Sequence, residues 1–284
     1  MTRILLALLC VLCCDIAAAQ DSPSFRRTAH STLFGFGAVR QMDSYLSPLD
    51  YRGPQLHLLH ETLRTTHLLD SCVSFQTLLQ ADFAYTHNKP EKANDLGGYI
   101  HFDAAWHYHL IGTPAKGSSY SSASPFRLLL GPQLGATLGG LYNTRNGNNP
   151  AQATAELHLS VSAAAIYTFR LWHQPLILRD QVDIPLLGAM FSPAYGQSYY
   201  ELFTLGNRDH NVRLTTPFNA PSLRNQFTID LPLRRFTLRL GYLADILQSH
   251  VNDIRHHTYS HAFMIGWVRH LSIERPRPTR TRSL

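Results

Sequence analysis

Three histidines and an aspartate form the first candidate site in the sequence. His101, Asp103, His107 and His109 would share one side of an extended strand, because side chains two positions apart point the same way. A metal ion needs three or four ligands converging at about 2.0–2.2 Å, whereas neighbours on one strand face lie about 7 Å apart. We interpret the three histidines as an uncharged interior lining and predict no metal and no cofactor. A metal site is the alternative.

An acid and a base stand side by side at Asp209 and His210, in a long polar segment. Such a pair could serve a hydrolase, but a working site also needs an orienting partner and an oxyanion donor. The chain contains no Gly-x-Ser-x-Gly sequence. We expect no enzymatic activity, and a barrel-rim hydrolase of protease or phospholipase type is the alternative.

Most of the chain around these candidates consists of long segments in which apolar and polar residues alternate. From Ala153 to Leu171 every odd position is apolar, whereas most even positions between them are polar. A period of two indicates a β-strand. Soluble strands run about 5–6 residues, whereas a strand that crosses a bilayer needs about 9–11. We count ten strands, or twelve if a further pair lies within Tyr195–Pro221. Long loops such as Gln41–Gly53 are expected between tight turns.

Composition indicates which strand face points outward. Charged residues make up 15% of the chain, below the roughly 25–35% of a water-facing surface. The three lysines, Lys89, Lys92 and Lys116, all fall in predicted loops, and aromatics such as Trp106 and Trp267 lie near strand ends. We predict an all-β fold, a transmembrane antiparallel up-and-down β-barrel with its apolar faces toward outer-membrane lipid. A soluble exported β-protein is the alternative.

The polar strand faces of such a barrel line its lumen, and they carry charges of both signs. Near balance of acids and bases predicts pairing and partial plugging of a narrow lumen, with no strong selectivity filter. The lumen-facing candidates are Asp82, Asp103, Arg127, Glu156, Arg179, Asp183, Asp230, Arg239 and Asp245. We predict a narrow channel, a binding surface or a structural component, with an unknown ligand.

The two ends of the chain differ in composition from the strand region. Residues 1–19 combine Arg3, an apolar run and closing alanines, which is typical of a secretory signal peptide. The barrel domain is expected over 20–273, followed by an Arg/Pro-rich tail at 274–284. Only Cys72 follows the signal peptide, so no internal disulfide is possible. An exported protein rarely meets nucleic acid, so we expect no nucleic-acid partner. A barrel of the outer membrane must be inserted there, so we expect the barrel-assembly machinery as a partner.

The segment Tyr195–Pro221 is unusually aromatic for a solvated loop. Its aromatic residues include Tyr199, Tyr200, Phe203 and Phe218. Long ordered loops usually pack their own side chains. We therefore expect a short helix over the barrel mouth, with a binding surface as the alternative.

Three stretches carry a resemblance to a known family: Tyr45–Pro54, Val182–Gly188 followed by Ser192–Glu201, and Pro217–Leu223. Together they resemble an uncharacterised domain-of-unknown-function family of exported, outer-membrane β-barrel-like proteins from gut-type Gram-negative anaerobes. The likeness spans about Tyr45–Leu271. It implies a barrel in the outer membrane of a Gram-negative bacterium, and it implies no activity, cofactor or catalytic residue.

Overall fold

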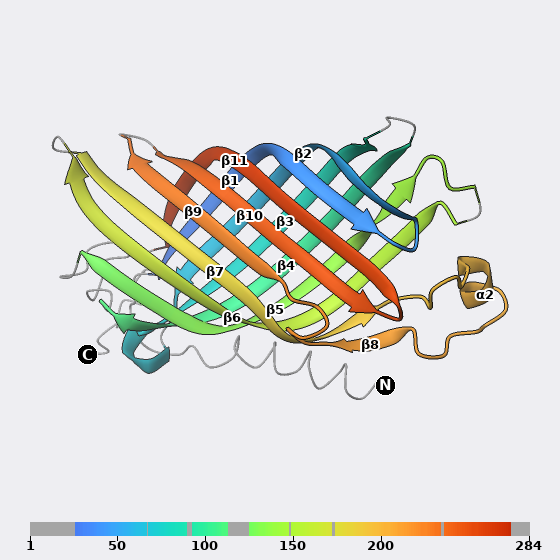
Figure 1. The fold of residues 1–284 in the computed structure, drawn as a ribbon. Helices are drawn as coiled ribbons and strands as arrows, with labels where there is room; N and C mark the ends of the chain where they lie inside the picture. Colours follow the sequence, from blue (N-terminus) through green and yellow to red (C-terminus); the bar gives the residue numbers. More distant parts are fainter. Residues whose placement is uncertain are drawn as a thin grey trace, which may run out of the picture.

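In the computed structural model of the protein, long antiparallel strands curl into one closed barrel (Figure 1). The structure describes residues 26–66, 68–89, 93–112, 125–147, 149–171, 174–233 and 236–273. The predicted signal peptide and the Arg/Pro-rich tail lie outside the described residues.

Ten strands form the closed wall, as the sequence predicts. The first seven each pair with their neighbour along the chain, β9 then pairs with β7, and β11 returns to β1. Their bounds are β1 Arg26–Asp43, β2 Ser47–Thr65, β3 Val73–Asn88, β4 Asn94–Ile111, β5 Phe126–Asn143, β6 Ala151–Leu171, β7 Gln174–Phe191, β9 Leu223–Pro232, β10 Thr237–Val251 and β11 Ile254–Ile273. The alternative of twelve strands is wrong, because the remaining strand, β8 Val212–Thr215, pairs only with the last residues of β7. A 3₁₀ turn, η1 Leu68–Ser71, links β2 to β3.

The two ends of the barrel differ. We call the end where β1 begins and β11 finishes the terminal end, and the opposite end the loop end. The loop end carries the segment 192–222, which contains β8 and the short helix α2 Tyr199–Phe203 (Figure 1). The long loop expected over Gln41–Gly53 is wrong, because β1 and β2 continue to a turn of only three residues, 44–46. Gly53 lies within β2 and pairs with Val39 of β1. Its lack of a side chain permits close contact with β3, because a Cβ there would clash with the backbone oxygen of Tyr85.

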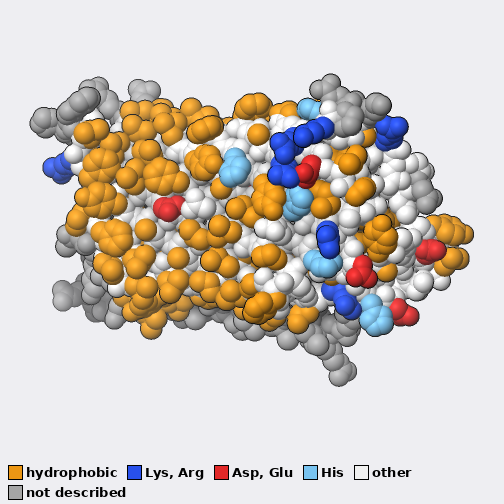
Figure 2. Space-filling model, in the orientation of Figure 1, with side chains coloured by type: hydrophobic (Ala, Val, Ile, Leu, Met, Phe, Trp, Pro, Cys, Tyr) orange, Lys and Arg blue, Asp and Glu red, His pale blue; other side chains and the backbone are white. Residues whose placement is uncertain are grey.

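The outer face of the wall is apolar, as the strand alternation predicts. Along β6, for example, Leu157, Leu159 and Val161 are exposed, whereas Ser160 and Ser162 are buried. Figure 2 shows hydrophobic side chains over most of the visible face, with charged and histidine side chains gathered toward the loop end. The apolar side chains of a soluble barrel would point inward instead, so the exterior is the surface that needs an apolar environment.

Aromatic rings mark the outer face near the terminal end. Phe34 lies against Trp267 with ring centroids 6.1 Å apart, and Phe75 lies against Trp106 at 5.0 Å. The guanidinium of Arg64 stands 4.7 Å from the centroid of the Phe75 ring. Rings with polar or cationic neighbours are typical of a membrane–water interface.

The interior is mixed, whereas the sequence indicated a polar lining. One buried apolar cluster consists of Leu33, Leu59, Leu78, Leu243 and Met264. A second consists of Leu129, Ala164, Ile166 and Ile177. All of these side chains come from the wall strands and are at most 9% exposed, so apolar as well as polar side chains pack in the interior.

The expected helix in the segment Tyr195–Pro221 is confirmed as α2. A capping box starts it: the Ser198 hydroxyl accepts from the Glu201 backbone N–H, and the Glu201 carboxylate accepts from the Ser198 backbone N–H. The Tyr199 hydroxyl accepts from the Ala153 backbone N–H of β6, so the helix lies against the rim. The rings of Tyr200 and Phe203 remain exposed. No helix among the described residues is long and apolar enough to span a bilayer.

Candidate functional site

The terminal half of the lumen is crossed by a carboxylate held between two arginines. Glu61 of β2 lies 2.5 Å from Nη1 of Arg179 on β7 and 2.6 Å from Nη1 of Arg239 on β10. All three side chains are almost fully buried. Four strands lie between β2 and β7 in either direction round the wall, so these two strands face each other across the barrel. The ion pair with Arg179 therefore bridges opposite walls.

Further hydrogen bonds saturate this group, which we call the Glu61 cluster. The Glu61 carboxylate also accepts from Ser31 Oγ at 3.0 Å and from Gln76 Nε2 at 2.8 Å. Arg239 turns its other edge to Asp230, with Nε–Oδ1 and Nη2–Oδ2 distances of 2.6 and 2.8 Å. Buried charges are tolerated only when their partners and hydrogen bonds are in place, and the Glu61 carboxylate meets that condition.

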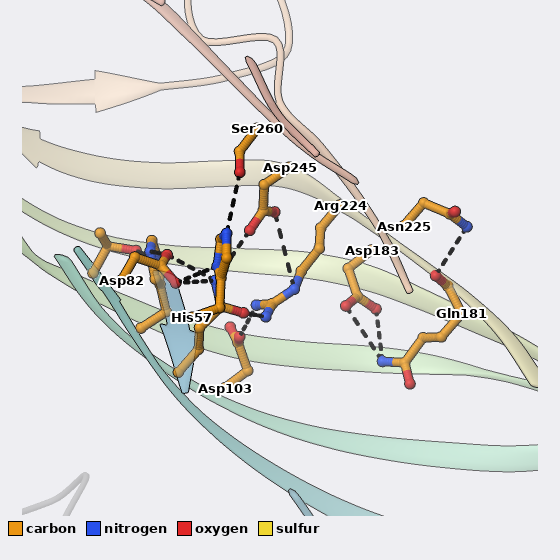
Figure 3. Close-up of polar contacts among 12 residues, drawn as sticks. His57, Asp82, Asp103, Gln181, Asp183, Arg224, Asn225, Asp245 and Ser260 are labelled. Atoms are coloured by element: carbon orange, nitrogen blue, oxygen red, sulfur yellow. Dashed lines mark hydrogen bonds and ion pairs between the residues drawn. The ribbon is translucent and has the colours of Figure 1, made fainter. Parts of the chain in front are cut away.

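A second cross-lumen group, the Arg224 cluster, lies nearer the loop end (Figure 3). Arg224 of β9 donates to the side-chain oxygen of Gln80 on β3, which stands on the opposite wall. Its Nη1 lies 3.1 Å from Asp103 on β4, and its Nε lies 3.9 Å from Asp245 on β10. One guanidinium thus joins four strands at mid-lumen.

Asp82 extends this cluster through two histidines. Its carboxylate lies 2.6 Å from His57 Nδ1 and 3.1 Å from His101 Nε2. His57 Nε2 is in turn 3.4 Å from Ser260 Oγ, as Figure 3 shows, so an acid, an imidazole and a hydroxyl follow one another. The Ser260 hydroxyl, however, donates to Gln55 Oε1 at 2.5 Å and is buried. With no exposed nucleophile, we interpret this series as part of the lumen packing.

The nine charged residues that the sequence places in the lumen all lie on inward strand positions. Eight of them are buried, whereas Glu156 is half-buried at a cavity wall. The Glu61 cluster contains Arg179, Asp230 and Arg239, and the Arg224 cluster contains Asp82, Asp103 and Asp245. Asp183 accepts from Ser162 Oγ at 2.5 Å between the two clusters, and Arg127 lies on β5 near the terminal end. The closed barrel thus brings together charges from strands far apart in sequence.

Sequence reasoning missed the two residues at the centres of these clusters. Glu61 stands in the segment Gln55–His67, where Leu58 and Leu59 interrupt the alternation. In the structure Glu61 points inward, and Arg64, an odd number of positions away, points outward.

Arg224 is the second residue of β9, directly after the loop segment 192–222, where a strand start is hard to place from sequence. The signal for it was present in the sequence. Arg224, Gln226, Thr228 and Asp230 alternate with period two, and all four side chains are buried.

The other histidines of the first motif diverge to separate partners. His107 Nε2 lies 2.8 Å from Ser162 Oγ, and His109 Nε2 lies 2.6 Å from Ser74 Oγ. In the part of the chain that the structure describes, no three His, Cys, Asp or Glu side chains are grouped so that they could hold a metal ion. The hydroxyl contacts satisfy one ring nitrogen of each histidine within the wall.

The hydrolase candidates Asp209 and His210 lie in the loop between α2 and β8, and both are exposed. Among the described residues neither side chain makes a hydrogen bond or an ion pair. His210 has a positive φ of 62°, and its backbone oxygen accepts from Asn252 Nδ2 at 3.0 Å. The backbone of His210 is therefore held in place. A catalytic acid–base pair also needs a group that orients its side chains, and the described residues provide none for Asp209 and His210.

Beyond the Arg224 cluster, toward the loop end, the lumen holds a cavity of about 70 Å³. Strands β4 to β7 and β9 to β11 contribute its wall, together with Ala220 and Ser222 of the loop. Four carboxylates and one guanidinium face it: Asp103, Glu156, Asp183, Asp245 and Arg224. Three histidines also line it, and each lies within 4 Å of a carboxylate: His101, His158 and His256. We call this space the loop-end cavity.

A tyrosine fixes the loop segment at the rim of the same end. The Tyr45 hydroxyl, in the β1–β2 turn, donates to the Gln197 backbone oxygen at 2.8 Å. Burial, helped by the nearby Tyr199 and acidic groups, raises the pKa of Tyr45 to about 12. The hydroxyl therefore remains a donor throughout the physiological range.

Comparison with known proteins assigns the family. The family model described as "Protein of unknown function (DUF3316)" matches residues 4–278. The chain belongs to this family. The resemblance to a domain-of-unknown-function family is thereby confirmed. No curated protein matches the DUF3316 chain.

The chain is also similar to solved structures of outer-membrane proteins. The outer membrane protease OmpT from Escherichia coli shares 8% identity at a TM-score of 0.46, over 90% of this chain and 99% of that chain. The translocator domain of the autotransporter NalP from Neisseria meningitidis shares 9% at 0.38, over 94% and 95%. The COG4313 outer membrane channel from Pseudomonas putida F1 shares 8% at 0.35, over 90% and 98%. A protease, a translocator and a channel differ in activity, so the similarity in fold does not assign an activity to this chain.

Proposed function

We propose that this DUF3316 protein is an outer-membrane β-barrel with a closed lumen, which acts as a surface-exposed binding or structural component and not as an open channel. One observation carries the proposal: Glu61 and Arg179 pair across opposite walls of the barrel. The second bridge, from Arg224 to Gln80, closes the lumen again nearer the loop end. An ion or solute would have to break both bridges to pass.

The dimensions of the apolar exterior support a membrane position. On β2 the outward arginines Arg52 and Arg64 enclose the exposed Leu56 and Leu58. The twelve steps between them, at about 3.3 Å per residue and a tilt of about 45°, span roughly 28 Å. A bilayer hydrocarbon core is about 30 Å thick. The belt between the two arginines thus matches a membrane.

The predicted signal peptide and the barrel topology support the outer membrane of a Gram-negative bacterium. Bacterial outer-membrane barrels place short turns in the periplasm and longer loops outside. The terminal end is then periplasmic, and the loop end with its 192–222 segment faces the exterior. Outer-membrane lipid and the barrel-assembly machinery are the partners that such a protein requires.

The proposal includes no enzymatic activity. Asp209 and His210 are exposed and lack side-chain partners among the described residues, and Ser260 is buried within the wall. Purified protein should therefore hydrolyse neither a protein substrate nor phospholipid vesicles above the background of the buffer. Hydrolysis by the wild type that disappears in Asp209→Asn and in His210→Ala would establish the rim hydrolase instead.

Conductance measured in planar lipid bilayers tests the closed lumen. The full chain is exported, extracted in detergent and shown to be folded by heat-modifiable gel migration, and a sixteen-stranded porin in the same bilayer serves as the positive control. We expect stable insertion and a current indistinguishable from that of the bare bilayer. Discrete conductance steps from wild-type protein would contradict the closed lumen, and a polypeptide that stays monomeric without detergent would contradict the membrane barrel.

A further inference from the structure

The loop-end cavity has the chemistry of a binding site for a positively charged group. We propose that it binds the ammonium or guanidinium group of a small organic cation. The inference rests on the proposed function only for the direction in which the cavity faces, which is the cell exterior.

The first observation is an excess of negative charge around the cavity. Arg224 is the single arginine in its wall, and it is already engaged by Asp103, Asp245 and Gln80. Glu156 and Asp183 face the same space, and neither makes an ion pair with an arginine or lysine among the described residues.

These two carboxylates have only neutral partners. Asp183 accepts from the Ser162 hydroxyl at 2.5 Å and from Gln181 Nε2 at 3.0 Å. Glu156 accepts from the Thr215 hydroxyl at 3.5 Å, a long hydrogen bond. A carboxylate at a poorly hydrated wall gains most from a cationic donor, because attraction between charges strengthens as the dielectric constant falls.

The second observation is independent of charge. Gln133 and Ser160 line the cavity, and each is only 2% exposed. Gln133 Oε1 and Ser160 Oγ have no hydrogen-bond partner among the described residues. A buried polar atom without a partner costs about 1–3 kcal/mol, so such atoms usually indicate a ligand or an ordered water. Both oxygens can accept, and an N–H donor from a ligand would satisfy them.

The size and the residue set select the class of ligand. A volume of about 70 Å³ accommodates a charged head group with a short alkyl stem and excludes a folded peptide. A metal ion is disfavoured, since the described residues contain no suitable group of three His, Cys, Asp or Glu side chains. An anion would meet four carboxylates, and the arginine and the three histidines of the wall already lie beside acidic groups. An organic cation fits each of these conditions.

Binding of defined probes to the folded full chain in detergent tests the proposal. The probes are n-propylammonium and methylguanidinium, with n-propanol and propionate as neutral and anionic counterparts of similar size. Saturation-transfer NMR titrations measure each Kd. We expect a Kd of about 0.1–10 mM for the two cations, given the few atoms that they contain, and at least about tenfold weaker binding of the counterparts.

Two carboxylate-to-amide variants locate the site. Glu156→Gln should weaken propylammonium at least about tenfold, whereas Asp209→Asn, a matched change on the exposed loop, should leave the Kd within about twofold. Gel mobility before and after heating shows that each variant is folded. If Glu156→Gln does not fold, the comparison of cation with n-propanol on the wild type still decides.

Several outcomes would overturn the proposal. These are no saturable cation binding, equal binding of n-propanol or propionate, and equal weakening by Asp209→Asn. The result is separate from the conductance test, because a conducting barrel could still bind the probes and a closed barrel could fail to bind them.

Discussion

The Glu61 cluster and the loop-end cavity occupy the same lumen, but their charges are satisfied differently. Glu61 receives two arginines, a hydroxyl and an amide, all within 3.0 Å. Glu156, at the cavity wall, has one hydroxyl at 3.5 Å. Both carboxylates come from inward positions on barrel strands, so the strand pattern does not distinguish them. The difference is the number of partners that the opposite wall supplies.

This contrast separates a stabilising element from a candidate binding element. A saturated cluster joins the walls, because breaking it leaves charges buried without partners. An unsaturated cavity contributes less to folding and retains interactions for a ligand. In folded proteins, buried polar groups that lack hydrogen-bond partners are often found at functional sites.

The largest effect is expected from removal of the central carboxylate. Glu61→Leu removes the carboxylate that pairs with the buried Arg179 and leaves Arg239 with Asp230, so it should lower the free energy of unfolding by about 3–5 kcal/mol. Glu156→Leu leaves no arginine or lysine without its partner, so it should lower the free energy of unfolding by less than about 1 kcal/mol. Urea unfolding in detergent, followed by gel mobility, compares the two variants. Equal loss in both would contradict the contrast.

A change at Arg224 should move stability and binding in opposite directions. Arg224→Gln breaks the bridge to Gln80 and should cost about 2–3 kcal/mol. It also frees Asp103 and Asp245 toward the cavity, so propylammonium should bind at least about threefold more tightly. Arg213→Gln on the exposed strand β8 is the matched control and should change neither quantity. A variant that loses stability and also loses cation affinity would mean that Arg224 shapes the cavity.

A methyl group added at Gly135 should narrow the cavity. A Cβ there would overlap His158 Nε2 and Asp103 Oδ1, both at the cavity wall, so these side chains must move. Gly135→Ala should cost about 1–2 kcal/mol and weaken propylammonium severalfold. Gly98→Ala is the control, because its Cβ would have no heavy atom nearer than 4.0 Å. Unchanged binding in Gly135→Ala would place the ligand elsewhere.

The smallest effect concerns the rim hydrogen bond of Tyr45. Its pKa is about 12 in the folded protein against about 10 in an unfolded chain. The folded state holds this proton more tightly, so the contribution to stability is complete below about pH 10 and is lost as pH rises from about 10 to 12. Tyr45→Phe should cost about 0.5–1.5 kcal/mol at pH 8 and remove that dependence.

Ultraviolet difference spectra of wild type against Tyr45→Phe measure the titration of this one tyrosine. Unfolding midpoints at pH 8 and pH 11 then measure its consequence for stability. An ordinary pKa near 10 in the difference spectrum would show that the Tyr45 hydroxyl is not held at the rim.

Local residue patterning was sufficient to predict the strands, their two faces and a β-barrel. Alternation is a local property, because successive side chains on a strand point to opposite sides, and Ala153–Leu171 displays it without reference to any other segment. Strand boundaries are less well predicted by the local pattern. The composition of Gln41–Gly53 is that of a loop, but pairing with the neighbouring strands extends β1 and β2 through most of it.

Which inward charges meet depends on the closed, three-dimensional arrangement of the strands. Glu61 and Arg179 are 118 residues apart, and Arg224 and Gln80 are 144 apart. Their contact depends on how many strands close the wall and on the register of each pair, which side-chain type alone does not specify. The unsatisfied Gln133 and Ser160 of the loop-end cavity emerge for the same reason, because a polar residue lacks a partner only once every other strand is in place.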